Sequence, residues 1–253
     1  MSLEIAHKTL NPMAIMYTCY NQVGFLVIDT HSLNPALLID DQREIVILNM
    51  ELNDINLPQA HNSAIGRLVV GITGASGAIL GIRLLEVLRP TPIETHLVLS
   101  ASAPLTIHQE TDWRIEDVLS LANVSYDFHD VGSAIASGSF TTLGMVIIPC
   151  SIKTLSAIAN SYTDDLISRA ADVTLKEGRQ LVLVVRETPY HPGHLRLMSD
   201  AATAGAVIFP PVPAFYIRPQ SMEEIINNTV GRILARLGIK NELFQEWQGQ
   251  SPK

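Results

Sequence analysis

The sequence is poor in cysteine, in long apolar runs and in positive charge. Its 253 residues include two cysteines, Cys19 and Cys150, too few for a disulfide framework, so we expect a reducing compartment, the cytoplasm. No apolar run reaches the roughly 18 residues of a membrane-spanning helix, and no signal-peptide pattern appears, so we expect no membrane span. With 17 basic against 25 acidic residues the formal net charge is −8, which argues against general nucleic-acid binding. The composition is that of a soluble enzyme.

Metal-binding patterns are also scarce. Asp164-Asp165 is too short to be an aspartate-rich cluster of the kind that holds Mg²⁺. His191 and His194 have a spacing that some metal sites use, but no cysteine or third histidine accompanies them nearby. We therefore expect no metal site.

The most informative stretch that the sequence does contain is the turn Thr73-Gly74-Ala75-Ser76-Gly77-Ala78. It follows the apolar run 68–72 and leads directly into a helical pattern that begins at Ile79. In a strand, turn and helix of this kind, unpaired backbone N–H groups and the helix dipole converge on one point. The turn is therefore expected to hold a phosphate.

The glycine spacing points to a mononucleotide. Gly71, Gly74 and Gly77 give G-x-x-G-x-x-G instead of the G-x-G-x-x-G that fits a dinucleotide pyrophosphate. The second predicted strand, 95–99, ends in Ser100-Ala101-Ser102, without the carboxylate that holds the ribose in dinucleotide folds. The ligand is therefore expected to resemble FMN more than NAD, although small residues in a tight turn are also compatible with packing alone.

The chain divides near residue 66. Residues 1–65 are predicted to be an N-terminal extension of uncertain structure, because Asn, Asp and Pro interrupt its apolar segments. This extension packs on the domain surface, has a function of its own, or reflects the choice of start codon, and the sequence does not separate these accounts. Residues 66–240 are predicted to form one domain, and 241–253 a C-terminal tail.

Strand and helix patterns alternate from Arg67 onward. The predicted strands are 68–72, 95–99, 144–149, 181–185 and 206–209. The predicted helices lie near 77–89, 102–109, 151–160, 165–177, 193–203 and 221–237. The runs at 144–149 and 181–185 are continuously apolar, as expected of parallel strands covered on both faces. The fold class is therefore α/β, a doubly wound, Rossmann-like, mostly parallel sheet flanked by helices, with ligands beyond the carboxyl ends of its strands.

Polar residues follow two of these strands. Ser151 and Thr154 come after 144–149 and either cap a helix or hold the polar edge of a ligand. Arg186 and Glu187 come after 181–185, at the expected crevice, although a surface ion pair would show the same pattern. Cys150 is expected to be a buried apolar residue and not a nucleophile, because no histidine or acid stands at a suitable local spacing.

Taken together, a series of motifs resembles the UbiX-type flavin prenyltransferases, in order and spacing, over about residues 67–238. The motifs are T-G-A-S-G-A (73–78), S-A-S-A-P-L-T-I-H-Q-E-T-D (100–112), A-S-G-S-F (136–140), P-C-S-I-K-T-L-S-A-I-A (149–159), L-I-S-R-A-A-D-V-T-L-K-E (166–177), L-V-L-V-V-R-E-T-P (181–189), G-A-V-I-F-P-P-V-P-A-F-Y (205–216) and R-P-Q-S (218–221). The resemblance implies transfer of a dimethylallyl group from dimethylallyl monophosphate to N5 and C6 of reduced FMN, without a metal. It also implies a homododecamer and delivery of prenylated FMN to a UbiD-type decarboxylase, in ubiquinone synthesis or aromatic-acid decarboxylation.

The resemblance also assigns site residues. It implies that the donor phosphate contacts Ser137, Gly138, Arg169, Lys176, Arg186, Tyr216 and Arg232. It implies that FMN contacts Gly74, Ala75, Ser76, Ser100, Ser151, Ile152, Lys153, Thr154 and Arg186. The implied catalytic residues are Ser76, Glu110, Lys176, Glu187 and Tyr216, with the Ser76 hydroxyl near flavin N5 and proton-transfer roles for the two glutamates.

One departure from the family and two alternative functions are also considered. Asp165 stands where the family commonly has asparagine, and its charge would weaken phosphate binding if it contacted the ligand. A flavin-dependent cysteine decarboxylase is one alternative, but it would want a catalytic histidine after the second strand, and His108 lies within a prenyltransferase motif. A non-catalytic flavin-binding regulatory protein is the other, and the intact Lys176 and Glu187 argue against it.

Overall fold

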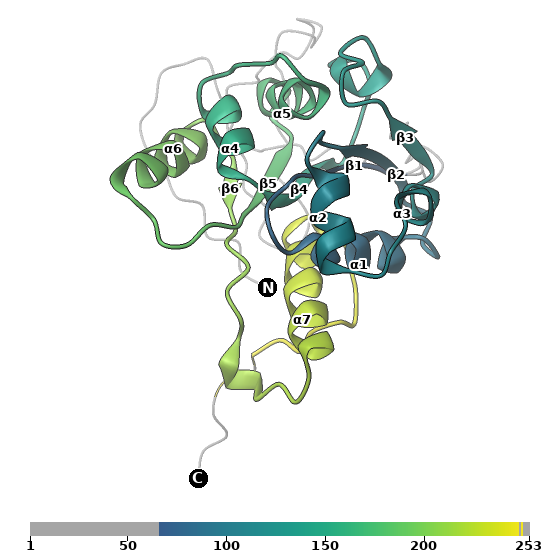
Figure 1. Cartoon of the computed structure of the whole chain (residues 1–253), viewed down its shortest axis with the longest axis vertical. Helices are drawn as coiled ribbons and strands as arrows, with labels where there is room; N and C mark the ends of the chain where they lie inside the picture. The colour runs from purple at the N-terminus through teal and green to yellow at the C-terminus, as the bar shows by residue number, and fades with distance from the viewer. Residues whose placement is uncertain (1–65, 248, 250–253) are drawn as a thin grey trace, which may run out of the picture. The chain divides into compact units, whose positions relative to one another are not determined.

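The computed structural model describes residues 66–247 and 249 (Figure 1). The predicted extension 1–65, Cys19 and residues 248 and 250–253 of the predicted tail lie outside the described residues. In the described part of the chain, no helix is long and apolar enough to cross a membrane.

Six parallel strands form one sheet in the order β3-β2-β1-β4-β5-β6. The strands are β1 (Arg67–Ile72), β2 (Glu94–Leu99), β3 (Val124–Tyr126), β4 (Gly144–Cys150), β5 (Gln180–Val185) and β6 (Val207–Ile208). The five predicted strands are confirmed within one or two residues at each end. β3 was not predicted, because a three-residue edge strand with an exposed central residue carries almost no apolar pattern.

Helices connect the strands and cover both faces of the sheet. They are α1 (Ala78–Leu88), α2 (Ala103–Glu110), α3 (Ile115–Leu121), α4 (Ile152–Ala159), α5 (Leu166–Lys176), α6 (Pro192–Thr203) and α7 (Met222–Arg236). Short 3-10 turns occur at η2 (Ala134–Ala136) and η3 (Phe215–Ile217). The six predicted helices are confirmed, and α3, of seven residues, was not predicted. The doubly wound α/β class is confirmed.

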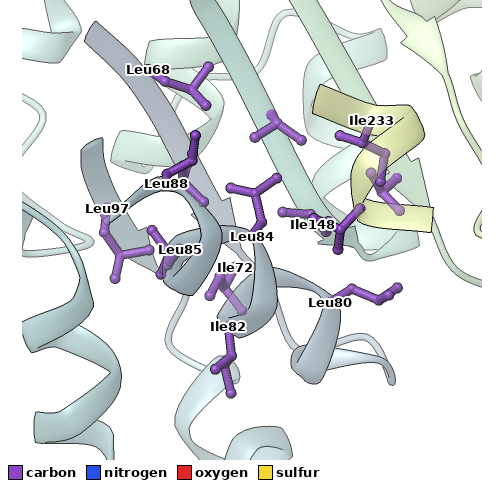
Figure 2. Close-up of a cluster of buried hydrophobic side chains, with 14 of the residues drawn as sticks. Leu68, Ile72, Leu80, Ile82, Leu84, Leu85, Leu88, Leu97, Ile148 and Ile233 are labelled. Carbon is purple, nitrogen blue, oxygen red and sulfur yellow. The ribbon is translucent and has the colours of Figure 1, made fainter. Parts of the chain in front are cut away.

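Alternate residues of each strand face different helical layers. Val70 and Ile72 of β1 pack with Ile148 of β4 in a core under α1, α3 and α7 (Figure 2). Val69 and Ile147 point the other way, into a core shared with α4, α5 and α6. Both central strands are buried along their lengths, so their apolar runs reflect burial on two faces. The two cores leave only the ends of the strands open to a ligand.

Gly81 allows α1 to lie directly against the sheet. A Cβ at this position would clash with the Ile148 carbonyl oxygen and lie 2.9 Å from Ile72 side-chain atoms. We expect Gly81→Ala to lower the free energy of unfolding by about 2–3 kcal/mol, because the helix would have to move off the sheet. Urea denaturation would measure this change.

Gly132→Ala is the matched control for that substitution. Gly132 lies in an exposed loop, where the atom nearest to an added Cβ is Asp130 Oδ1 at 3.5 Å. We expect its stability to stay within about 1 kcal/mol of the parent, because an added methyl group makes only an ordinary van der Waals contact. Equal unfolding midpoints for both variants would show that α1 does not need the close approach.

Candidate active site

The carboxyl ends of β1 and β4 lie side by side at the point where the strand order reverses. The chain leaves β1 toward β2 and later returns on the other side of β1 as β4. α1 follows β1 and packs on one face of the sheet, whereas α4 follows β4 and packs on the other. In open α/β sheets this divergence creates a crevice for ligands.

The turn after β1 holds an anion, but the anion is a carboxylate of the chain itself. Gly77 has φ of 102° and is the N-cap of α1, a conformation that favours glycine. The Gly77 and Ala78 amides donate to Glu110 Oε2 at 2.8 and 3.2 Å. The sequence predicts that a phosphate binds at this end of the helix. Two of the amide donors expected to bind that phosphate are paired with Glu110.

Glu110 is held in its ionised form. Desolvation alone would raise the pKa of its carboxyl, but hydrogen bonds from Ser76, Gly77 and Ala78 and the nearby Arg186 charge lower that pKa below its ordinary value. The bonds from Gly77 and Ala78 place the Glu110 carboxylate beside Ser76 of the same turn, and the Arg186 charge is near enough to act on it. The structure thus brings together three of the predicted site residues.

The turn after β2 packs closely against the turn after β1. The Ser100 amide donates to Ile72 O at 2.9 Å, and the Thr106 hydroxyl donates to Gly74 O at 3.1 Å. A Cβ on Gly74 would clash with the Ser102 side chain, so only glycine fits this approach. Ser100 and Gly74 therefore lie at the same rim.

The turn after β4 completes this rim. Ser151 is the N-cap of α4, and its hydroxyl accepts from the Thr154 amide at 3.3 Å, so the predicted capping role is confirmed. Ile152 and Lys153 form the first turn of α4, and the Lys153 side chain is exposed. Burial raises the pKa of the Cys150 thiol, so this residue is not poised as a nucleophile.

Arg186 and Glu187 lie at the carboxyl end of β5. The Arg186 amide donates to Cys150 O at 3.1 Å, which joins the end of β5 to the end of β4. The Arg186 side chain is exposed, and the Glu187 carboxylate accepts from the Thr188 amide at 2.9 Å. Both side chains therefore stand at the rim formed by the three turns. This rim consists of the residues that follow β1, β2, β4 and β5, together with Glu110. We call it the flavin-edge cluster.

Other predicted residues lie at the opposite end of the sheet, near the amino ends of β4 and β5. Lys176 is the last residue of α5, directly before β5, and a Cβ on Gly138 would lie 2.9 Å from its Nζ. Lys176 pairs with Glu177, whose pKa is lowered by the hydrogen bond and charge of Lys176. We call Ser137, Gly138, Lys176 and Arg179 the amino-edge cluster. β5 separates it from Arg186 by roughly 17 Å, at about 3.3 Å per residue.

Arg179 was missed by sequence reasoning and organises this second cluster. Its guanidinium donates to Gly138 O at 2.6 Å and to Phe140 O at 2.8 Å, so it fixes the loop that carries Ser137 and Gly138. A cation just before a predicted strand was the only signal, and any surface arginine gives the same one. Thr73 and Thr106, which join the turns of the flavin-edge cluster, were also missed, because a threonine at a strand end or within a helix is common and gives no signal of its contacts.

The three remaining residues that are predicted to bind the donor phosphate lie outside both clusters. Arg169 is on α5 and contacts Asp172 at 3.5 Å, two turns before Lys176 on the same helix. Arg232 of α7 stands over the Phe209 ring at 5.8 Å, near the end of β6. Tyr216 is 54% exposed on η3, in the segment that leaves the sheet after β6 and returns into α7 (Figure 1). One copy of the chain therefore does not bring the predicted phosphate-binding residues together.

Asp165 has a structural role in the described fold. It is buried at the N-cap of α5, where its carboxylate accepts from the Ser168 amide at 2.8 Å in a capping box. Asparagine caps helices about as well as aspartate, which accounts for either residue at this position. The carboxylate is thus engaged by its own helix.

We expect Asp165→Asn to keep the parent's stability and Asp165→Ala to lower the free energy of unfolding by about 1 kcal/mol, because only alanine removes the cap. Chemical denaturation of the two variants would measure this difference. The affinity for a phosphate donor should be the same in Asp165→Asn and the parent. Tighter donor binding by Asp165→Asn would show that the carboxylate acts on the substrate.

Comparisons with known proteins show which proteins the chain is similar to. The sequence model of the Flavoprotein family matches residues 57–233. Flavin prenyltransferase UbiX of Escherichia coli (strain K12) is 62% identical over 186 residues, covering 72% of this chain and 98% of that protein. The structure of AnUbiX (PadA1) in complex with FMN and dimethylallyl pyrophosphate has a TM-score of 0.72 and 50% identity, covering 74% of this chain and 99% of that one. A dodecameric FMN-dependent UbiX-like decarboxylase from Escherichia coli O157:H7 has a TM-score of 0.71 and 47% identity, covering 72% and 100%.

Proposed function

The chain belongs to the flavoprotein family and, within it, to the UbiX-type flavin prenyltransferases, and from this premise we propose how its residues divide the reaction. The enzyme transfers a dimethylallyl group to reduced FMN. When bound, reduced FMN supplies the two accepting atoms, N5 and C6. The observation that supports the proposal most strongly is the flavin-edge cluster, in which Ser76, Glu110 and Arg186 share one neighbourhood at the divergence of β1 and β4.

The residues of the flavin-edge cluster fit FMN. Gly74 allows the turn after β1 to pack closely against Ser102 in the turn after β2, so both turns belong to one rim. The residues that would hold FMN are Gly74, Ala75, Ser76, Ser100, Ser151, Ile152, Lys153, Thr154 and Arg186. The Ser76 hydroxyl, close to the ionised Glu110, is positioned to orient the ring near N5. We assign Glu187 the removal or relay of a proton, because it follows Arg186 directly at the carboxyl end of β5, at the rim that would hold FMN.

Cationic side chains neutralise the charge that develops on the departing phosphate. We assign this role to Arg169, Lys176, Arg186 and Arg232, with Tyr216 as a hydroxyl donor and Ser137 and Gly138 as lining. Because these groups do the work that Mg²⁺ does in other prenyl enzymes, we predict that turnover is unchanged in EDTA. Loss of activity in EDTA, restored by Mg²⁺, would contradict this prediction.

The distance between the two clusters suggests that each reaction site uses residues of more than one copy. Lys176 precedes β5 and Arg186 follows it, so within one chain the strand, roughly 17 Å long at about 3.3 Å per residue, lies between the two residues. We propose that the amino-edge cluster of one copy lies at the flavin-edge cluster of another, in a homododecamer like that of the UbiX-like relative. The exposed Tyr216 fits this arrangement, because it too would reach the site of a neighbouring copy.

The donor and the recipient are the finer parts of the proposal. We propose dimethylallyl monophosphate as the donor, although the solved relative holds the pyrophosphate. A UbiD-type decarboxylase would receive the prenylated FMN, in ubiquinone synthesis or aromatic-acid decarboxylation. A cytoplasmic location stays a prediction, with which the free, buried Cys150 is compatible. No observation at the site favours the cysteine decarboxylase or the regulatory protein.

The test is an anaerobic incubation with reduced FMN and either dimethylallyl monophosphate or the pyrophosphate, followed by mass spectrometry of the flavin. We expect a flavin heavier by one dimethylallyl group with the monophosphate and less product with the pyrophosphate. Faster reaction with the pyrophosphate would overturn the donor assignment. Recovery of unmodified FMN in both arms, from folded and flavin-loaded protein, would overturn the proposed function.

A further inference from the structure

Thr73 joins the turn after β1 to the turn after β4. Its side chain is 1% exposed, and its hydroxyl donates to Pro149 O at 2.7 Å and accepts from the Ser151 amide at 2.9 Å. The Thr73 amide also donates to Pro149 O at 3.3 Å. One buried hydroxyl thus donates to the end of β4 and accepts from the first residue of the turn that follows it.

The Thr73 hydrogen bonds lie just beyond the last regular pair of β1 and β4. The regular pairing of β1 with β4 runs from Leu68–Gly144 to Gly71–Ile147. Beyond that point the two strands lead into helices on opposite faces, so the separation of their turns is no longer set by the sheet. Thr73 stands at the start of this divergence.

We propose that Thr73 is a positioning residue that sets the separation between the Gly74–Ser76 turn and the Ser151–Thr154 turn, and thereby the affinity for FMN. The inference rests on the proposed function, because it takes these two turns as the walls of the flavin site. Valine has nearly the shape of threonine but can neither donate nor accept. Without the hydroxyl the Ser151 amide loses its partner, and the turn after β4 shifts to reach water.

Thr95 offers a matched control at the other end of the sheet. It is also 1% exposed, and its hydroxyl likewise donates once and accepts once, to Asn123 Oδ1 at 3.0 Å and from the Asn123 amide at 3.1 Å. Thr95 is the second residue of β2, near the amino ends of the strands. Replacing either threonine by valine therefore removes the same chemistry, but only Thr73 borders the flavin site.

The experiment measures the FMN dissociation constant by fluorescence for the full-length parent, Thr73→Val, Thr73→Ser and Thr95→Val, with thermal unfolding of each. We expect about tenfold weaker FMN binding in Thr73→Val, recovery to within about twofold in Thr73→Ser, and parent-like binding in Thr95→Val despite a similar loss of stability. The KM for the phosphate donor at saturating FMN should not change in Thr73→Val.

Parent-like FMN affinity in folded Thr73→Val would overturn the inference, as would an equal loss of affinity in Thr95→Val. If Thr73→Val does not fold, Thr73→Ala replaces it and is compared with Thr73→Ser. Folded Thr73→Ala must then bind FMN more weakly than Thr73→Ser, and equal affinities would overturn the inference. A parent protein that does not bind FMN would overturn the proposed function itself, and that result is visible before any variant is compared.

Discussion

Replacing Glu187 by glutamine should reduce turnover by about a hundredfold or more, while FMN affinity stays close to that of the parent. Glutamine keeps the size and the acceptor oxygen that bonds the Thr188 amide, so the local fold should survive. It cannot carry a proton between the flavin, the phosphate and water. The expected loss is therefore confined to the steps in which a proton moves.

Single-turnover measurements under anaerobic conditions separate this chemical loss from binding. Glu116→Gln is the control, because Glu116 is an exposed glutamate on α3. It should keep parent-like rates. Unchanged turnover in Glu187→Gln would remove Glu187 from the mechanism and leave Glu110 as the glutamate to examine.

Replacing Lys176 by methionine should lower kcat/KM for the phosphate donor by about 100- to 1,000-fold, because a charge that stabilises the leaving phosphate is lost. Stability should change little, since the Lys176–Glu177 pair lies on the surface. FMN affinity should also stay at the parent value, because Lys176 is assigned to the donor phosphate and not to the flavin.

Steady-state kinetics with varied donor concentration would measure this effect, with Lys240→Met as the exposed-lysine control. A parent-like kcat/KM for Lys176→Met would show that the amino-edge cluster takes no part in the reaction. Weaker FMN binding in Lys176→Met, with donor kinetics unchanged, would place Lys176 at the flavin instead.

Apolar patterning made most of the fold predictable. β4 and β5 are buried on both faces, so nearly every residue in them is apolar and the strands stand out in the sequence. α3 and β3 escaped because each is short and half-exposed at the edge of the sheet, where neighbouring elements stabilise them more than their own sequence does. The division into an extension, a domain and a tail stays a prediction.

The motifs identified residues of the site but not their distances. Ser76 and Arg186 could be expected at one end of the sheet, because each follows the carboxyl end of a strand in a parallel sheet. The contact of Glu110 with the Gly77 and Ala78 amides could not, since it joins the far end of α2 to the start of α1. The separation of Lys176 from Arg186 follows from the predicted strand 181–185 that lies between them, but the sequence does not show what the Lys176 side chain contacts.

The central claim is that one reaction site combines the flavin-edge cluster of one copy with the amino-edge cluster of another. Mixed assemblies of Glu187→Gln and Lys176→Met, carrying two different affinity tags and purified through both, test it most directly. Prenylated flavin is measured by mass spectrometry against each variant alone. In a random mixture, half of the flavin-edge clusters and half of the amino-edge clusters are intact. We therefore expect about a quarter of the parent activity, from the sites that combine an intact cluster of each kind from two chains. Activity no higher than that of the single variants would show that both clusters must belong to the same chain, and would contradict the account.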